Sequence, residues 1–177
     1  ECLSNPARVL TEINRILQGK IEESFVTACS LFIDIVNGRV LYANAGHPPP
    51  FLWKNSKKEV SRFPFGGTIL GPFPELVYEN VTLGLAKDDR LILYTDGIIE
   101  TRSKTGEFFG DDRLEEFVKG HSSDSADCMA DKFIEHLTLW SGRSQERELD
   151  DDLTFIVISV MAEPDAPKLG TSRITSS

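Results

Sequence analysis

Two apolar segments that carry acidic residues at one end constrain the fold of this chain most strongly. Residues 91–94 read Leu-Ile-Leu-Tyr and continue into Thr95-Asp96-Gly97, and the largely apolar residues 153–158 follow three aspartates at 150–152. Short apolar runs rich in β-branched and aromatic residues predict buried strands. A carboxylate beside such a strand is costly unless another charge compensates it. The sequence therefore predicts two buried strands, each with an acidic tip.

The acidic tips indicate a site for a hard divalent cation, because such cations prefer oxygen ligands. Metal-assisted hydrolysis is the leading functional hypothesis, since a bound cation can activate water. The chain has 19 Lys and Arg against 28 Asp and Glu, a net charge of −9. Such a chain lacks the basic face of a nucleic-acid binder and favours divalent cations or basic protein surfaces, although solubility alone explains the charge equally well.

The cysteines indicate a reducing environment. Cys2, Cys29 and Cys128 are widely spaced and form no CxxC pair, which argues against a zinc site or a disulfide framework. We therefore expect a cytoplasmic protein, or the cytoplasmic domain of a larger one. No apolar run approaches the roughly 18 residues of a membrane span, and we expect no signal peptide. Because the chain lacks an initiator Met and opens almost directly into a helix, we expect a piece of a longer protein.

The order of periodic segments predicts an α+β protein with antiparallel sheets, not a repeating βαβ pattern. A helix is expected to start at Asn5-Pro6 and to end near Gly19, with an apolar stripe that includes Ile13 and Ile16 packed in the core. Two more helices are expected, one from Asp111 or Asp112 to Gly120 and one from Ser123 or Ser125 to about Trp140. Strands are expected over residues 25–35, 39–44, 51–53, 60–63, 78–83, 90–95 and 153–161.

Two connections have recognisable turn chemistry. Asn37-Gly38 predicts a type I′ hairpin turn. Residues 66–72 are glycine-rich but lack the Lys-Ser/Thr ending of a phosphate-binding P-loop, so we expect an irregular loop without a ligand role.

Four short stretches occur in a fixed order along the chain. They are Phe25-Val26-Thr27-Ala28, residues 42–50 (Tyr-Ala-Asn-Ala-Gly-His-Pro-Pro-Pro), residues 94–100 (Tyr-Thr-Asp-Gly-Ile-Ile-Glu) and Asp151-Asp152-Leu153-Thr154. Each is weak alone, but together they resemble the PP2C-type metal-dependent protein phosphatases, most closely the bacterial SpoIIE/RsbU branch. The resemblance covers roughly residues 4–161.

The resemblance implies a fold, a reaction and partners. The fold would be a PP2C-like sandwich of two antiparallel sheets flanked by α-helices. The reaction would be removal of phosphate from phosphoserine or phosphothreonine at a two-metal centre that holds Mn²⁺ or Mg²⁺. The substrate would be a phosphorylated anti-anti-sigma-factor-like protein in sigma-factor regulation, and relatives usually carry an upstream sensory or receiver domain. A homodimer is compatible with this picture, whereas contact with nucleic acid or a membrane is not expected.

The resemblance also assigns site residues. Asp96 and Asp151 match two metal ligands, while Gly97, Asp150 and Asp152 are neighbours that could stand in as ligands or tune the site. The alternative role for Asp96 is to cap the turn before Gly97.

Two further residues are expected near the site as structural groups. His47 is tempting as a base or ligand, but its position between Gly46 and three prolines favours a structural, hydrogen-bonded histidine. Glu100 is expected to hold the loop after Gly97 or to be a solvated acid.

The chain departs from the family pattern in what it lacks. The other metal-binding acids of the family lie upstream, in an early Gly-Asp motif and a Gly-Asp-Val-Ser-Gly-His-Gly-like stretch, and neither occurs here. We therefore expect residues 1–162 to be the C-terminal portion of a phosphatase domain without its N-terminal strands or its full metal site, and residues 163–177 to be a disordered tail. A smaller departure lies at Asp88, where relatives usually have Gly before an Asp-Arg pair.

Two other functions compete with the phosphatase hypothesis. One is a non-catalytic signalling module that keeps the fold and binds a partner. The other is an unrelated hydrolase with a single Mg²⁺ site.

Overall fold

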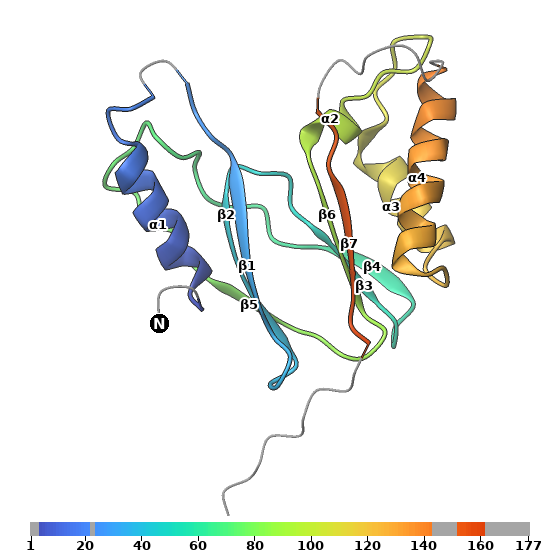
Figure 1. Cartoon of the computed structure of the whole chain (residues 1–177), viewed down its shortest axis with the longest axis horizontal. Helices are drawn as coiled ribbons and strands as arrows, with labels where there is room; N and C mark the ends of the chain where they lie inside the picture. The colour runs from blue at the N-terminus through green and yellow to red at the C-terminus, as the bar shows by residue number, and fades with distance from the viewer. Residues whose placement is uncertain (1–3, 22–23, 143–151, 162–177) are drawn as a thin grey trace, which may run out of the picture.

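Two antiparallel β-sheets lie face to face, with α1 outside one sheet and α3 and α4 outside the other (Figure 1). The computed structural model describes residues 4–21, 24–142 and 152–161. One sheet has the order β1 (Ala28–Asp34), β2 (Arg39–Ala45), β5 (Val81–Gly84), and the other has the order β4 (Glu59–Arg62), β3 (Phe51–Lys54), β6 (Arg90–Tyr94), β7 (Phe155–Ser159). The helices are α1 (Pro6–Leu17), α2 (Asp96–Ile99), α3 (Gly110–Gly120) and α4 (Ala126–Ser141). The expected α+β fold with two antiparallel sheets flanked by helices is confirmed.

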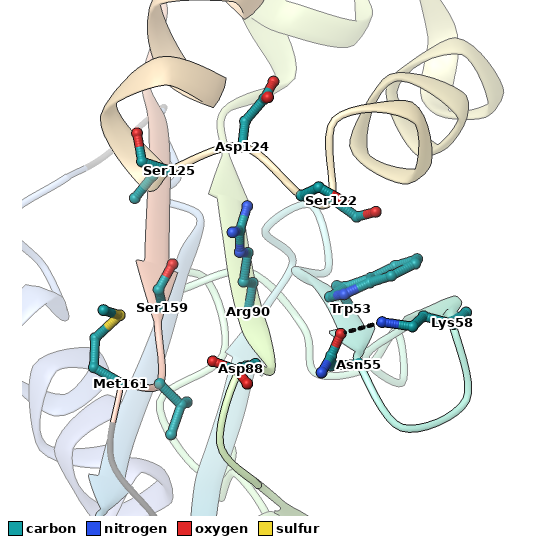
Figure 2. A pocket seen from close by; sticks show the side chains of 13 residues that line it. Trp53, Asn55, Lys58, Asp88, Arg90, Ser122, Asp124, Ser125, Ser159 and Met161 are labelled. Carbon is teal, nitrogen blue, oxygen red and sulfur yellow. Dashed lines mark hydrogen bonds between the residues drawn. The ribbon is translucent and has the colours of Figure 1, made fainter.

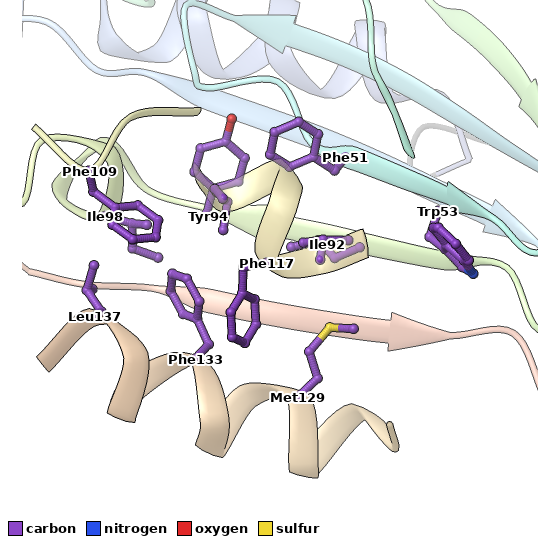
Figure 3. Close-up of a cluster of buried hydrophobic side chains, with 12 residues drawn as sticks. Phe51, Trp53, Ile92, Tyr94, Ile98, Phe109, Phe117, Met129, Phe133 and Leu137 are labelled. Atoms are coloured by element: carbon purple, nitrogen blue, oxygen red, sulfur yellow. The ribbon is translucent and has the colours of Figure 1, made fainter. Parts of the chain in front are cut away.

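Three apolar clusters hold the layers together. α1 packs on the first sheet around Leu10, and Tyr42 and Leu91 belong to the cluster between the two sheets. α3 and α4 cover the other face of the second sheet, where Ile92 packs with aromatic side chains of both helices (Figure 3). Because successive strand residues point to opposite faces, β6 buries Leu91 between the sheets and Ile92 under the helices. Burial on both faces explains why this strand reads as an unbroken apolar run.

The start and end of α1 follow the predicted signals. The Asn5 side chain accepts a hydrogen bond from Arg8 N at 3.1 Å, and Pro6 occupies the first helical position. Gly19 follows the helix with a φ of 67°, a conformation that favours glycine.

The apolar stripe expected on α1 is only partly buried. Ile13 and Ile16 are 37% and 52% exposed, whereas Asn14 is fully buried. Asn14 Nδ2 donates to Phe73 O and its Oδ1 accepts from Gly71 N, both at 2.8 Å. A buried amide with both ends satisfied costs little, so this polar contact turns the helix away from the predicted orientation. The prediction that the whole stripe packs in the core is wrong.

The hairpin between β1 and β2 also differs from its prediction. Asp34 pairs with Arg39, so residues 35–38 form a four-residue loop. Gly38 has a φ of 58°, but Asn37 does not have the positive φ that a type I′ turn requires. The Asp34 carboxylate accepts hydrogen bonds from Asn37 N at 3.1 Å and Asn37 Nδ2 at 2.7 Å. This Asx-type contact stabilises the wider loop, and the type I′ prediction is wrong.

Several element boundaries shift because of contacts distant in sequence. β1 begins at Ala28, since Val26 instead forms an isolated bridge with Leu70 of the glycine-rich loop. The four-residue helix α2, which starts at Asp96, was not predicted. Residues 163–177, expected to be a disordered tail, lie outside the described residues, and the domain boundary at 162 stays a prediction.

β1 and β7 are edge strands of their sheets within the described chain. Apolar side chains near these edges are open to solvent: Ile35 is 64% exposed, Ile156 44% and Met161 79%. Such edges favour pairing with a further segment of polypeptide or with another copy of the protein. A homodimer stays a prediction. No helix in the described ranges is both long and apolar enough to cross a membrane.

A buried carboxylate fixes the turn before β6. Asp89 is fully buried, and its Oδ2 accepts from Lys54 Nζ at 2.7 Å and from Ala86 N at 2.9 Å. Asp89 Oδ1 accepts from Asn55 N at 3.0 Å, so the side chain links β6 to the end of β3. Asp88, where relatives usually have Gly, has a φ of 65°. The turn thus keeps the conformation that glycine adopts easily, because Asp is among the residues that tolerate it.

Replacing Asp89 with alanine is expected to lower the free energy of unfolding by about 3 kcal/mol, because it leaves the charge of Lys54 and two backbone N–H groups without their partner. Urea denaturation followed by circular dichroism measures the change. Lys87→Ala, at an exposed position of the same turn, is the control and should stay within about 0.5 kcal/mol of the unmodified chain. A loss below about 1 kcal/mol for Asp89→Ala would contradict this account.

Candidate metal centre

The antiparallel pairing of β6 with β7 brings the end of one acidic segment to the start of the other. Tyr94 is the last residue of β6 and pairs with Phe155, the first residue of β7. Beyond this pair, Thr95 N donates to Thr154 O at 3.1 Å and Thr154 N donates to Thr95 Oγ1 at 3.0 Å. Thr95 Oγ1 also donates to Asp152 O at 3.3 Å. These three hydrogen bonds hold residues 152–154 beside Thr95 and Asp96.

Asp96 lies at this junction as the first residue of α2. Its Oδ1 accepts a hydrogen bond from Gly97 N at 3.1 Å, and the residue is exposed. The Asp96 carboxylate forms no ion pair with the described residues. This contact with the next residue leaves the other carboxylate oxygen open to a further partner. Whether Asp96 caps the turn or binds a metal stays a prediction.

The second predicted ligand is not described directly. Asp150 and Asp151 lie outside the described residues, whereas Asp152 is described and exposed. The structure places the backbone of Asp152 against Thr95. The convergence of the Asp96 and Asp151 carboxylates stays a prediction, as does the choice among residues 150–152.

His47 lies near the same junction and is held by its surroundings. Asn44 Oδ1 accepts from His47 N and Asn44 Nδ2 donates to His47 O, both at 2.8 Å. The His47 ring is half-buried, and its Nδ1 lies 3.4 Å from Thr27 Oγ1. Burial lowers the pKa of His47, while the charge of Asp96 and a hydrogen bond to the Tyr94 carbonyl act in the opposite direction. The backbone of His47 is therefore fixed by Asn44, and a structural role for its ring stays a prediction.

The glycine-rich loop supports this corner by close backbone packing. Gly67 has a φ of 76°, and a Cβ atom there would lie 1.7 Å from Asn44 O. The loop therefore contacts the residue that fixes His47, and only glycine permits this approach. This contact gives the loop a packing role that the sequence analysis did not predict.

The segment after Gly97 is held by a residue that the sequence reading did not single out. Thr101 is 8% exposed, and its Oγ1 donates to Gly97 O at 2.7 Å. Glu100 is exposed, its backbone N–H donates to Asp96 O at 2.9 Å, and its carboxylate has no partner among the described residues. The contact that fixes Gly97 therefore comes from Thr101. The sequence signal for this role was a Thr that stands four residues after the glycine of the Thr-Asp-Gly motif.

The donor chemistry of the junction suits a hard cation. Asp96 and Asp152 are exposed residues at paired strand ends, and carboxylate oxygens are what Mg²⁺ and Mn²⁺ prefer. Within the ranges described, however, no group of three or more His, Cys, Asp and Glu side chains is arranged to hold a metal ion. The described residues thus fit part of a cation site.

Comparison with known proteins gives this geometry a context. The sequence profile of the family described as Stage II sporulation protein E (SpoIIE) matches residues 1–161. The chain is 27% identical over 155 residues to phosphoserine phosphatase RsbU of Bacillus subtilis (strain 168), and 27% identical over 161 residues to phosphoserine phosphatase RsbP of the same organism. These matches cover 87% and 88% of the chain. It spans less than half of either relative, 45% of RsbU and 37% of RsbP.

Solved structures confirm the expected fold. The SiaA-PP2C domain of Pseudomonas aeruginosa superposes with a TM-score of 0.76 at 20% identity, covering 88% of this chain and 61% of that one. The similarity shows that the two sheets and their helices are those of a PP2C domain.

Replacing Thr95 with valine is expected to loosen the junction, because it removes the acceptor of Thr154 N–H and the donor to Asp152 O. The free energy of unfolding should fall by about 1 kcal/mol, and the Thr154 amide should exchange with solvent deuterium faster than in the unmodified chain. Thr95→Ser keeps the hydroxyl and is the matched control. Equal exchange rates in the valine and serine variants would contradict the assigned role of Thr95.

Proposed function

The chain belongs to the Stage II sporulation protein E (SpoIIE) family, and from this premise we propose that it forms the acidic part of the active site of a serine/threonine protein phosphatase. PP2C-family phosphatases are metal-dependent. The observation that supports the proposal is the junction at Thr95, where hydrogen bonds hold the backbone of Asp152 and Thr154 beside the residue that precedes Asp96. The names of RsbU and RsbP as phosphoserine phosphatases support the same reaction class.

In the proposed centre, Asp96 and Asp151 would hold the cation, with Asp150, Asp152 and Gly97 as neighbours that stand in or adjust the site. Mn²⁺ and Mg²⁺ both suit these oxygen donors. When bound, such cations would activate a water molecule and balance the charge of the phosphoryl oxygens. The water oxygen would form a bond to phosphorus as the bond from phosphorus to the serine or threonine oxygen breaks, and the leaving oxygen would take up the proton that the water releases, giving a free hydroxyl and inorganic phosphate.

The residues around the acids act by positioning them. Thr95 fixes the spacing between the two strand ends, and Thr101 fixes the backbone at Gly97. Asn44 fixes the backbone of His47 through two hydrogen bonds, and we propose a structural role for this histidine near the site.

A cysteine nucleophile is not part of the proposal. Cys29 lies in β1, and burial raises its pKa to about 11. A thiol with such a pKa carries little thiolate at neutral pH, and the thiolate is the nucleophile. Cys29 is therefore not proposed as a nucleophile, and direct attack by water is the route that the family resemblance implies.

The substrate we propose is a phosphorylated signalling protein of the anti-anti-sigma-factor-like kind, within a sigma-factor regulatory route. This assignment comes from the resemblance to the SpoIIE/RsbU branch. The same resemblance proposes a sensory or receiver domain as the regulatory partner.

Replacing Asp96 with asparagine should lower the turnover of a phosphoserine peptide by the complete natural enzyme at least about 100-fold, because the neutral amide keeps the size but removes the charge that a cation needs. Release of inorganic phosphate measures turnover, and the thermal midpoint checks that folding is kept. Asp131→Asn, at an exposed position of α4, is the matched control.

The same assay distinguishes the alternatives. EDTA should abolish turnover, and Mn²⁺ or Mg²⁺ should restore it. Unchanged turnover in Asp96→Asn would remove Asp96 from the site. No turnover with any divalent cation would favour the non-catalytic module, whose partner would then be bound without hydrolysis.

The 177-residue chain by itself is expected to bind Mn²⁺ weakly and to hydrolyse phosphate esters poorly. The reason is ligand count, since these cations prefer about six oxygen ligands and water would have to supply most of them. Isothermal titration calorimetry with Mn²⁺ tests the binding. Tight binding together with full Mn²⁺-dependent turnover by this chain would overturn the expectation.

A further inference from the structure

We propose that the chain carries a second ligand site, for a small oxyanion, at the end of the second sheet opposite the metal centre. A cavity of about 540 Å³ lies there between the sheet and the connection from α3 to α4 (Figure 2). Its walls include Trp53 from β3, Arg90 from β6 and Ser159 from β7, together with Ser122 and Asp124 from the helical connection.

The cavity is separate from the candidate metal centre. Arg90 and Tyr94 are the two ends of β6, and Arg90 pairs with Ser159 whereas Tyr94 pairs with Phe155. At the usual rise of a strand, about 13 Å separates the two ends. Arg90 also lies on the strand face that Ile92 and Tyr94 present to the helices. The cavity therefore opens beneath the helical layer, away from Asp96.

Two polar atoms in the cavity wall are buried without a partner. Arg90 Nη1 and Ser159 Oγ belong to paired residues of neighbouring strands, and neither has a hydrogen-bond partner in the described part of the chain. The Arg90 guanidinium forms no hydrogen bond or ion pair with any described residue. Buried polar groups are satisfied in the great majority of cases, and a buried charged donor is the costliest exception. Two adjacent orphan donors point to an acceptor that the protein itself does not supply.

The charges around the cavity favour an anionic acceptor. Lys58 lines the cavity, and its Nζ donates to the neutral Asn55 Oδ1 at 2.6 Å, so its charge is not matched there. Asp124 attracts Arg90, but its carboxylate is paired with Lys132 at 2.9 Å. Asp88, the other acid in the wall, is exposed, as is Lys58. The Arg90 guanidinium and the Lys58 ammonium therefore share the wall with one acid, Asp88, that has no ion pair among the described residues.

Arg90 and Ser159 together have the chemistry that recognises phosphate or carboxylate oxygens. A guanidinium presents N–H groups in a fixed fork, and a neighbouring hydroxyl adds another donor. Helix α4 begins at the cavity rim, but Ser125 already caps it by accepting from Cys128 N at 3.2 Å. The site therefore rests on Arg90 and Ser159 and not on the helix end.

Trp53 provides a direct readout, because it lines the cavity and the chain has only two tryptophans. In a Trp140→Phe background, the full chain is titrated with inorganic phosphate and, separately, with acetate, at constant ionic strength. EDTA is present so that no cation binds phosphate at the metal centre. We expect a saturable change in Trp53 fluorescence.

Variants assign the signal to the cavity. Arg90→Gln should weaken binding at least tenfold, and Ser159→Ala about threefold. Arg8→Gln, an exposed arginine on α1, is the matched control and should leave the affinity unchanged. The thermal midpoint of each variant checks folding, and if Arg90→Gln does not fold, Ser159→Ala and Lys58→Gln decide the question.

The outcomes are distinct. Saturation by phosphate alone supports a site for a tetrahedral oxyanion, and saturation by both anions supports a site for small oxyanions in general. No saturable change with either anion would overturn the proposal, as would equal affinity in the cavity variants and the control. The measurement does not use turnover, so its failure leaves the proposed phosphatase activity untouched.

Discussion

The pairing of β6 with β7 is the interaction on which the rest of the candidate site depends. These strands are antiparallel, so the acidic residues after one and before the other meet at the same edge of the sheet. The threonine hydrogen bonds at Thr95 extend this pairing past the regular ladder. Without that extension, Asp96 and Asp152 would belong to two independent loops. With it, the backbone of Asp152 is held beside Thr95, the residue before Asp96.

The layers on either side of this sheet keep the pairing in place. Leu91 packs between the sheets and Ile92 under α3 and α4, so a slip of one residue would exchange the two environments and misplace every side chain of the strand. Asn44 of β2 fixes the backbone of His47, and Gly67 of the glycine-rich loop packs closely on Asn44. Sheet packing, rather than contacts among the acids themselves, therefore decides where the acidic groups lie.

The sequence predicted those features that depend on local chemistry. Asn5, Pro6 and Gly19 defined α1, and the apolar runs defined the strands at the centre of the second sheet. The features that it missed depend on partners far along the chain. Val26 leaves β1 to pair with Leu70, and α1 turns to bury Asn14. The Asp34 side chain overrode the local preference of Asn37-Gly38 for a tighter turn.

The residues of the candidate site also fall into those that the sequence predicted and those that only the folded structure reveals. The motif around Asp96 was readable because a turn and a carboxylate follow an apolar run. The sequence predicted no role for Thr101 or Arg90, since Thr101 matters through a contact with Gly97, and Arg90 matters in the second site because its guanidinium has no partner among the described residues. Such properties exist only once the layers are assembled.

β6 is only five residues long, yet it is anchored at both ends: Asp89 connects its start to β3, and Thr95 connects its finish to the residues before β7. A strand anchored in this way acts as a spacer of fixed length. An insertion or deletion inside it has no loop in which to be absorbed, and would draw one anchor out of position. Among homologous chains, length variation should therefore fall in the loops and leave this strand untouched.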